Sequence, residues 1–215
     1  MECATTIGAA AAKVSGAVVS VIDFNPEKKS IEDLLVGADY YVIPRFQRPY
    51  SWEASNLEDF WTDVVFDNGV GYFIGPMVAW RDKDNPIRRL PDGHQRLTTT
   101  AIMFAVLRDQ LQELRETKLA SGVHRYLEKA DRNNELQFTL QTEVSSVFLS
   151  NAILKSPPDS TIEPASEEES ALSNALEQIR QLIGAEVAKR QHPQKWLIEL
   201  RDRLLGLKVI WVEHG

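Results

Sequence analysis

The sequence predicts an α+β fold, in which a small sheet built around one β-hairpin accompanies a predominantly helical remainder. Residues 72–80 are rich in β-branched and aromatic side chains, and a turn cluster at 81–86 separates them from a second short apolar run at 87–90. This arrangement is typical of a hairpin. From residue 97 the apolar positions recur at helical spacing, and similar spacing returns beyond residue 170.

Composition places the chain among ordinary soluble proteins and excludes several classes. Its 215 residues suit one domain, or one and a fraction, with 43% hydrophobic residues and a net charge of −7. A protein that depends on nonspecific DNA affinity is usually basic, so any DNA contact must be local. The single cysteine, Cys3, excludes an internal disulfide framework and a cysteine-based zinc site. We expect a cytoplasmic protein that does not enter the membrane.

The first third of the chain alternates short elements with a proline-stiffened loop. Residues 1–29 are expected to form an N-terminal extension, followed by a short helix at 30–35 and a strand at 40–43. Prolines at 44 and 49 then exclude regular structure from a loop that carries two arginines and several aromatic residues. A helix is predicted over 53–67. The loop holds its arginines at low entropic cost, and this favours a binding role.

The remaining elements are mostly helical. The hairpin is expected to lead into the longest helix, from Gly93 to about Lys118, followed by a helix at 121–130, a strand at 135–140 and a helix at 142–154. A connection at 155–169 contains prolines and an acidic run that is expected to begin the next helix. Helices at 170–189 and 194–205 and a strand at 208–212 complete the pattern. We therefore expect a nucleotide-binding domain at 30–154, a linker at 155–169, and residues 170–215 as a further part of the same domain.

The junction between hairpin and helix carries the strongest candidate for chemistry. Asp92 is predicted to be the N-cap, and Gln95 stands at the spacing of a capping box. Gly93 allows another group to approach the backbone closely. The unpaired N–H groups and the helix dipole at such an end attract anions, and Arg96 adds a planar fork that suits phosphate. An equally simple interpretation is that Asp92 only caps and Arg96 only pairs with an acid elsewhere.

Three ordered blocks resemble one known family. Asp-Gly-His-Gln-Arg-Leu-Thr-Thr at 92–99 is similar to the Asp-Gly-Gln-Gln-Arg-Leu-Thr-Thr signature of the GmrSD-type restriction (SspE-like phage-defence) family. Ile-Pro-Arg-Phe-Gln-Arg-Pro-Tyr-Ser-Trp at 43–52 and Tyr-Phe-Ile-Gly-Pro-Met-Val at 72–78 resemble two further blocks of that family. The resemblance covers roughly residue 30 to the end. His94 departs from it, because the family usually has glutamine there.

The resemblance implies a ParB-like N-terminal domain that binds and hydrolyses an NTP, such as GTP or UTP, with Mg²⁺, and acts on modified DNA. It implies an endonuclease activity only in a C-terminal region beyond residue 215. Asp92, which is also the possible Mg²⁺ ligand, Gln95 and Arg96 are the expected catalytic residues. The expected nucleotide ligands are Arg45, Gln47, Arg48, Gly93, His94 and Arg96.

Two other functions are compatible with the sequence. In the first, Arg45 and Arg48, together with Tyr50, would bind DNA in a sensing module that does not hydrolyse nucleotide. A protein–protein scaffold is compatible with the acidic balance and the helical second half. A homo-oligomer is a separate possibility. Arg45, Arg48, Asp92 and Arg96 are predicted to converge on one pocket if the nucleotide interpretation is correct.

Overall fold

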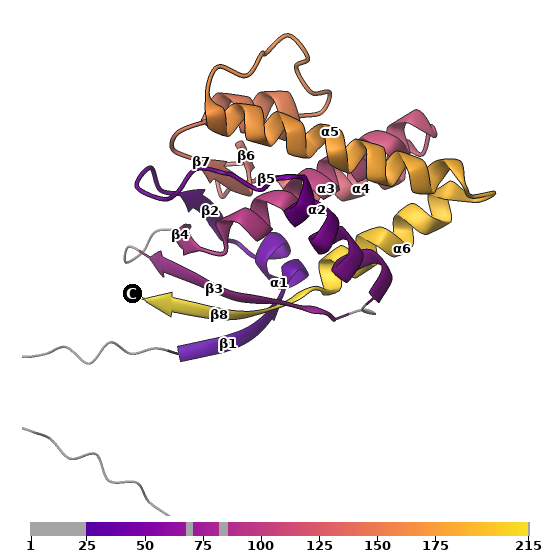
Figure 1. The fold of residues 1–215 in the computed structure, drawn as a ribbon. Coiled ribbons are helices and arrows are strands. Elements are labelled where there is room, and N and C mark those ends of the chain that lie inside the picture. Colours follow the sequence, from indigo (N-terminus) through magenta and orange to yellow (C-terminus); the bar gives the residue numbers. More distant parts are fainter. Residues whose placement is uncertain (1–24, 68–70, 82–85, 215) are drawn as a thin grey trace, which may run out of the picture.

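The computed structural model describes residues 25–67, 71–81 and 86–214, and its centre is a six-stranded mixed sheet (Figure 1). In the order in which they pair, the strands are β1 (Asn25–Ser30), β8 (Lys208–His214), β3 (Phe73–Arg81), β4 (Ile87–Asp92), β2 (Tyr40–Ile43) and β7 (Leu140–Thr142). In Figure 1 the helices gather above the β3–β8–β1 end of this sheet. The α+β fold class is thereby confirmed.

The predicted hairpin forms the middle of the sheet. Strands β3 and β4 pair antiparallel, with a register irregularity between Val78 and Trp80. On the other side of β3 lies β8, which is parallel to it, and β8 in turn pairs antiparallel with β1. Strand β1 therefore includes residues 25–29, which the sequence assigned to an extension. Its Pro-Glu-Lys-Lys composition has no apolar alternation, so the pattern of a strand is absent from it.

Helix α3 (His94–Glu113) is the core of the helical part. Every residue from 97 to 108 is buried, so the helix has no solvent-facing side over three turns. It packs against α4 (Thr117–Leu127), α5 (Glu167–Ala188) and α6 (Pro193–Gly206). Enclosure on all sides makes the N-terminal end of α3 a rigid platform for the residues that precede it.

The expectation that this helix would be the longest is wrong. Helix α3 has 20 residues, whereas α5 has 22. The sequence predicted helix up to Lys118, but Arg115 adopts a positive φ of 62° and separates α3 from α4. The acidic run does begin a helix, as expected, and Ser166 caps α5 by accepting from the backbone N–H of Glu169.

The shorter elements differ from the predicted boundaries where local patterns were weak. Helix α1 (Ile31–Val36) is as expected, and the predicted helix at 53–67 divides into α2 (Ala54–Trp61) and a π-helical segment η1 (Thr62–Asp67). The strand expected at 135–140 is two strands, β6 (Leu136–Phe138) and β7, and β6 pairs with β5 (Glu128–Ala130) in a separate ribbon. Only Phe148–Leu154 (η2) forms a helical element of its own within the helix predicted at 142–154.

Within the described ranges, no helix has the length and apolar character needed to cross a membrane.

Candidate functional site

The turn between β4 and α3 is built on Gly93 and not on the predicted aspartate cap. Gly93 is the N-cap and has a left-handed φ of 87°, while Asp92 is the last residue of β4 and pairs with Val78. A Cβ at position 93 would lie 2.5 Å from the Met77 side chain. Another group does approach the Gly93 backbone closely, as predicted, and that group is the Met77 side chain of β3.

The predicted capping box is also wrong, because the Gln95 side chain faces the proline-stiffened loop. Its Nε2 donates to the carbonyl of Pro49 at 2.9 Å, and its Oε1 accepts from the backbone N–H of Ser51 at 3.1 Å. The side chain is buried and satisfies both polar backbone groups on either side of Tyr50. Gln95 thus fixes the loop to the first turn of α3.

Tyr50 lies between those two bonds and points into the core. Its side chain is 3% exposed, and its hydroxyl lies 2.8 Å from the Thr99 hydroxyl. Burial raises the pKa of the Tyr50 phenol, so the group stays protonated. A tyrosine that is enclosed in this way supports the loop from inside and has no surface to offer to DNA.

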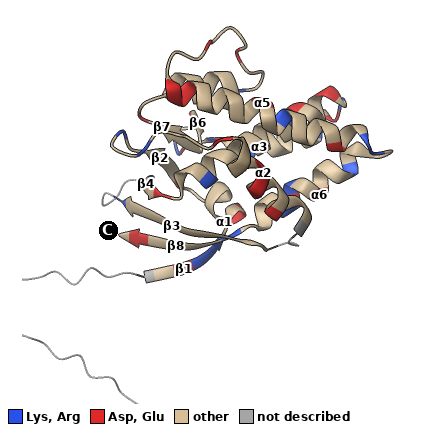
Figure 2. Cartoon of the chain, in the orientation of Figure 1, with Lys and Arg blue, Asp and Glu red and all other residues tan. Residues whose placement is uncertain are grey.

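A buried carboxylate that the sequence analysis missed completes this attachment. Glu168 accepts from the backbone N–H of Tyr50 at 3.0 Å and from the Ser145 hydroxyl at 2.6 Å. It belongs to the acidic first turn of α5 (Figure 2), where the helix dipole favours a negative charge. The sequence signal was the Glu167–Glu169 run, but only the fold identifies its middle member as the buried one.

Arg96 connects α3 to β3. Its Nη1 donates to the Ile74 carbonyl, and its Nη2 donates to the Pro76 carbonyl at 2.7 Å. The guanidinium occupies the space that a Cβ at Gly75 would need, and Gly75 has a φ of 105°. The third sequence block therefore contains a glycine because the arginine of the first block packs on it.

His94 holds the same loop one residue earlier. Its Nε2 lies 3.0 Å from the Arg48 carbonyl oxygen, to which the ring donates when that nitrogen carries the proton. Its Nδ1 is buried and has no hydrogen-bond partner among the described residues. Burial lowers the pKa of His94, while the hydrogen bond to the Arg48 carbonyl and the Asp92 charge raise it. Both charged residues adjoin His94, since Arg48 supplies this carbonyl and Asp92 lies two residues before the histidine.

Arg48 and Asp92 are the groups in this region that the protein leaves available. Both residues are exposed, and their charged side-chain atoms form no hydrogen bond or ion pair within the described ranges. Arg45 differs, because Glu143 accepts from its backbone and lies 3.9 Å from its guanidinium. Glu143 also binds Arg89. Gln47 is half-buried, and its backbone N–H donates to the Pro44 carbonyl at 3.0 Å.

The predicted site residues are brought together as segments, although they line different cavities. Arg48 borders a cavity of about 620 Å³ between the loop and α5. Arg96 borders another of about 430 Å³ between α2 and β3, and Trp52 contributes to both. The loop and the first turn of α3 are joined by the bonds of His94 and Gln95. Convergence of all four charged groups on one nucleotide stays a prediction.

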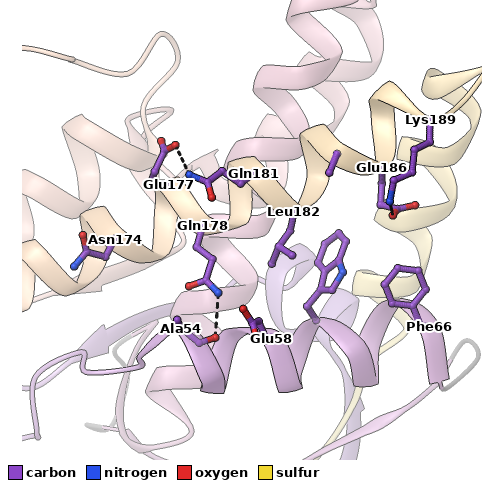
Figure 3. A pocket seen from close by; sticks show the side chains of 12 residues that line it. Ala54, Glu58, Phe66, Asn174, Glu177, Gln178, Gln181, Leu182, Glu186 and Lys189 are labelled. Carbon is purple, nitrogen blue, oxygen red and sulfur yellow. Dashed lines mark hydrogen bonds and ion pairs between the residues drawn. The ribbon is translucent and has the colours of Figure 1, made fainter.

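A further cavity of about 720 Å³ lies between α2 and α5 (Figure 3). Gln178 spans it by donating to the Ala54 carbonyl at 3.0 Å, and Glu186 pairs with Lys189 at 2.9 Å. Lys189, the cation in the lining, is thus neutralised by Glu186, and the carboxylates of Glu58 and Glu177 would repel a phosphate. This cavity does not suit a nucleotide's charged groups.

Protein ligands alone do not form a metal site in the described part of the chain, where no three histidine, cysteine or acidic side chains gather. Mg²⁺ that accompanies an NTP is held differently, by one or two carboxylates, water and the phosphates themselves. The exposed carboxylate of Asp92 fits that mode, since it has no hydrogen-bond partner among the described residues.

The comparisons with known proteins identify a family whose model covers all three sequence blocks. No curated protein matches the chain. A family model described as "GmrSD restriction endonuclease, N-terminal domain" matches residues 31–212, and this range contains the loop, β3, and the junction of β4 with α3. The match extends over most of the 215 residues. The chain therefore belongs to the GmrSD restriction endonuclease N-terminal domain family.

Proposed function

We propose that this chain is the NTP-binding and NTP-hydrolysing module of a DNA restriction protein that defends against phage by acting on modified or foreign DNA. The family supports a restriction role. The observation that carries the nucleotide part is the pair of unused charges, Arg48 and Asp92, beside the first turn of α3. No side chain caps that turn.

The chemistry of these groups suits a nucleotide's phosphates with a magnesium ion. The Arg48 guanidinium supplies a fork for phosphate oxygens, and the helix dipole at Gly93 attracts the same negative charge. Asp92 would hold Mg²⁺, as acids do in phosphoryl transfer. The remaining donors of Arg96 border the separate cavity between α2 and β3, where a part of the nucleotide other than its phosphates could reach them.

The test is phosphate release from each NTP, with and without modified DNA, together with binding measured by titration calorimetry. Arg48→Ala should weaken binding roughly 10- to 150-fold, because a charge-assisted hydrogen bond is worth about 1.5–3 kcal/mol. Asp92→Asn should leave binding nearer to normal and abolish turnover. Arg132→Ala and Asp202→Asn, at exposed positions on other elements, are the matched controls.

A DNA-binding module without turnover is the competing function. It predicts that the chain binds DNA through Arg45 and Arg48 while no NTP binds or loses phosphate. In that outcome Arg48→Ala lowers DNA affinity and the salt dependence of binding together, because one phosphate contact is lost.

A further inference from the structure

The cavity between α2 and β3 has features that the phosphate site does not use. It has a volume of about 430 Å³, within the range of small-ligand pockets, and α2, η1 and β3 supply most of its lining. Its walls combine aromatic rings with a few polar groups.

The aromatic wall is held in place. Trp52 packs edge to face against Phe60, with ring centroids 5.3 Å apart, and both residues line the cavity. Phe73 stands at the same cavity with half of its surface exposed. Flat rings of this kind provide stacking platforms for planar ligands.

The polar groups include both acceptors and donors. Asp59 and Asp63 project from successive turns of the α2–η1 helix, and Asp63 accepts from the Tyr72 hydroxyl at 2.9 Å. The Asp59 carboxylate has no hydrogen-bond partner among the described residues. Arg96 uses two of its five N–H donors for the carbonyls of Ile74 and Pro76, so the others remain.

The balance of charge excludes a phosphate in this cavity. Two carboxylates face one guanidinium, so the lining is negative overall and would repel an anion. It favours instead a planar ligand that donates N–H groups to a carboxylate and accepts from an arginine. Nucleobases with an exocyclic amine have both groups on one edge, and proteins recognise them with these side chains.

The geometry points to a nucleobase-binding pocket at Trp52, Asp59 and Arg96, which takes an amino-bearing base: guanine, adenine or cytosine. Trp52 stacks on the ring, Asp59 accepts from the amine, and Arg96 donates to a ring nitrogen or carbonyl oxygen. The base arrives either as part of a free nucleotide or extruded from a DNA strand. This assignment does not require that the chain hydrolyse NTPs.

Nucleosides test the pocket separately from any phosphate site, because they carry no phosphate. Titration calorimetry on the whole chain should show binding of guanosine, adenosine or cytidine. Uridine and thymidine, which lack the amine, should bind with an affinity lower by roughly tenfold or more. Asp59→Ala, which removes the acceptor altogether, should remove most of this preference. Trp52→Ala should weaken every nucleoside roughly 5- to 150-fold, as expected for a lost stacking contact.

Glu58→Gln is the matched control, since Glu58 is the neighbour of Asp59 on α2 but lines the cavity next to α5. Trp52→Phe keeps an aromatic ring if the alanine variant is unstable, and should retain binding. A short single-stranded oligonucleotide distinguishes the sources of the base. Binding of the oligonucleotide alone, lost in Asp59→Ala, assigns the pocket to an extruded base.

The inference is overturned if neither nucleosides nor oligonucleotide bind. Equal binding of uridine and cytidine would also overturn it, as would an affinity that Asp59→Ala leaves unchanged. The two proposals can fail separately, because the Asp59→Ala variant can lose nucleoside binding and still hydrolyse NTP at an intact phosphate site.

Discussion

Arg96 shows how one side chain can be necessary for a site by holding the fold. Its two bonds to the β3 carbonyls of Ile74 and Pro76 involve no acid, so truncation would leave carbonyl groups short of a donor without burying an unpaired charge. We expect Arg96→Ala to lower the free energy of unfolding by about 2–3 kcal/mol. Arg96→Lys should recover only part, since a single ammonium cannot reproduce the fork. Urea denaturation measures both variants.

A double-mutant cycle with Gly75 checks the origin of this loss. Gly75→Ala should be costly in the native chain, because the new Cβ meets the guanidinium. In Arg96→Ala only the cost of the positive φ at position 75 remains, so the two effects should fall short of additivity by more than about 0.5 kcal/mol. Additive effects would show that the guanidinium does not pack on Gly75, and lost NTP turnover in Arg96→Ala at unchanged stability would show that the arginine acts on the ligand.

His94 is expected to make the protein sensitive to acid. Burial lowers its pKa in the folded state, so below the unfolded value of about 6.5 only the unfolded chain readily takes up the proton. Stability should therefore be intact above that pH and fall as the pH drops toward the folded pKa. Unfolding in urea at about pH 8 and about pH 5.5 should show a larger loss for the native chain than for His94→Gln.

The same variant tests the one departure from the family signature. An amide at position 94 can still donate to the Arg48 carbonyl, so we expect His94→Gln to keep or raise NTP turnover. A pH response that is equal in both proteins would show that the imidazole is not the titrating group. Lost turnover would mean that His94 has a role of its own.

At the scale of elements, the loop from Pro44 to Trp52 depends on the first turn of α5. Glu168→Ala would leave the Tyr50 N–H and the Ser145 hydroxyl without their acceptor, which should cost about 1–3 kcal/mol per buried group. Because the loop carries Arg48, NTP affinity should fall in parallel. Glu168→Gln should be milder, because an amide still accepts from Tyr50 and can donate to Ser145.

Glu167→Ala is the control, since Glu167 is exposed in the same turn. Thermal melting and nucleotide titration on the three variants form the measurement. If Glu168→Ala melts like Glu167→Ala and binds nucleotide normally, the carboxylate does not hold the loop.

The elements that could be predicted were those with a local cause. The β3–β4 hairpin and α3 follow from alternation and helical spacing, and α5 follows from its acidic beginning. Strand β1 could not be predicted, because its residues become a strand only by pairing with β8. The same holds for β7, which exists because β2 lies beside it.

The candidate site divides in the same way. Proximity of the two arginine-bearing blocks was expected from the resemblance, and hydrogen bonds from His94 and Gln95 do join them. The direction of each side chain depends on contacts between distant segments. Gln95 was expected to cap a helix and instead binds a loop, and Glu168 had no sequence feature that set it apart from its two neighbours.

At the scale of the whole molecule, β1 protects the edge of β8. The family match begins at Ile31, so a chain cut at that boundary would lack β1 and the Ser30 cap of α1. The exposed edge of β8 would then offer unpaired backbone groups to another chain. We expect a protein that starts at residue 31 to aggregate on heating, whereas one that starts at residue 25 stays monodisperse. Light scattering during a thermal ramp compares them, and equal behaviour would show that β1 is dispensable.

The place of β8 also decides when β3 acquires both of its neighbours during synthesis. Strand β3, which anchors Arg96 and packs against Gly93, has β8 as a neighbour, and the two are separated by more than a hundred residues of chain. Contacts of such long range form late and slowly. Residue 214 must therefore leave the ribosome before β3 has both of its partners, so the strand that holds Arg96 and Gly93 is completed only after α3, α5 and α6 have been made.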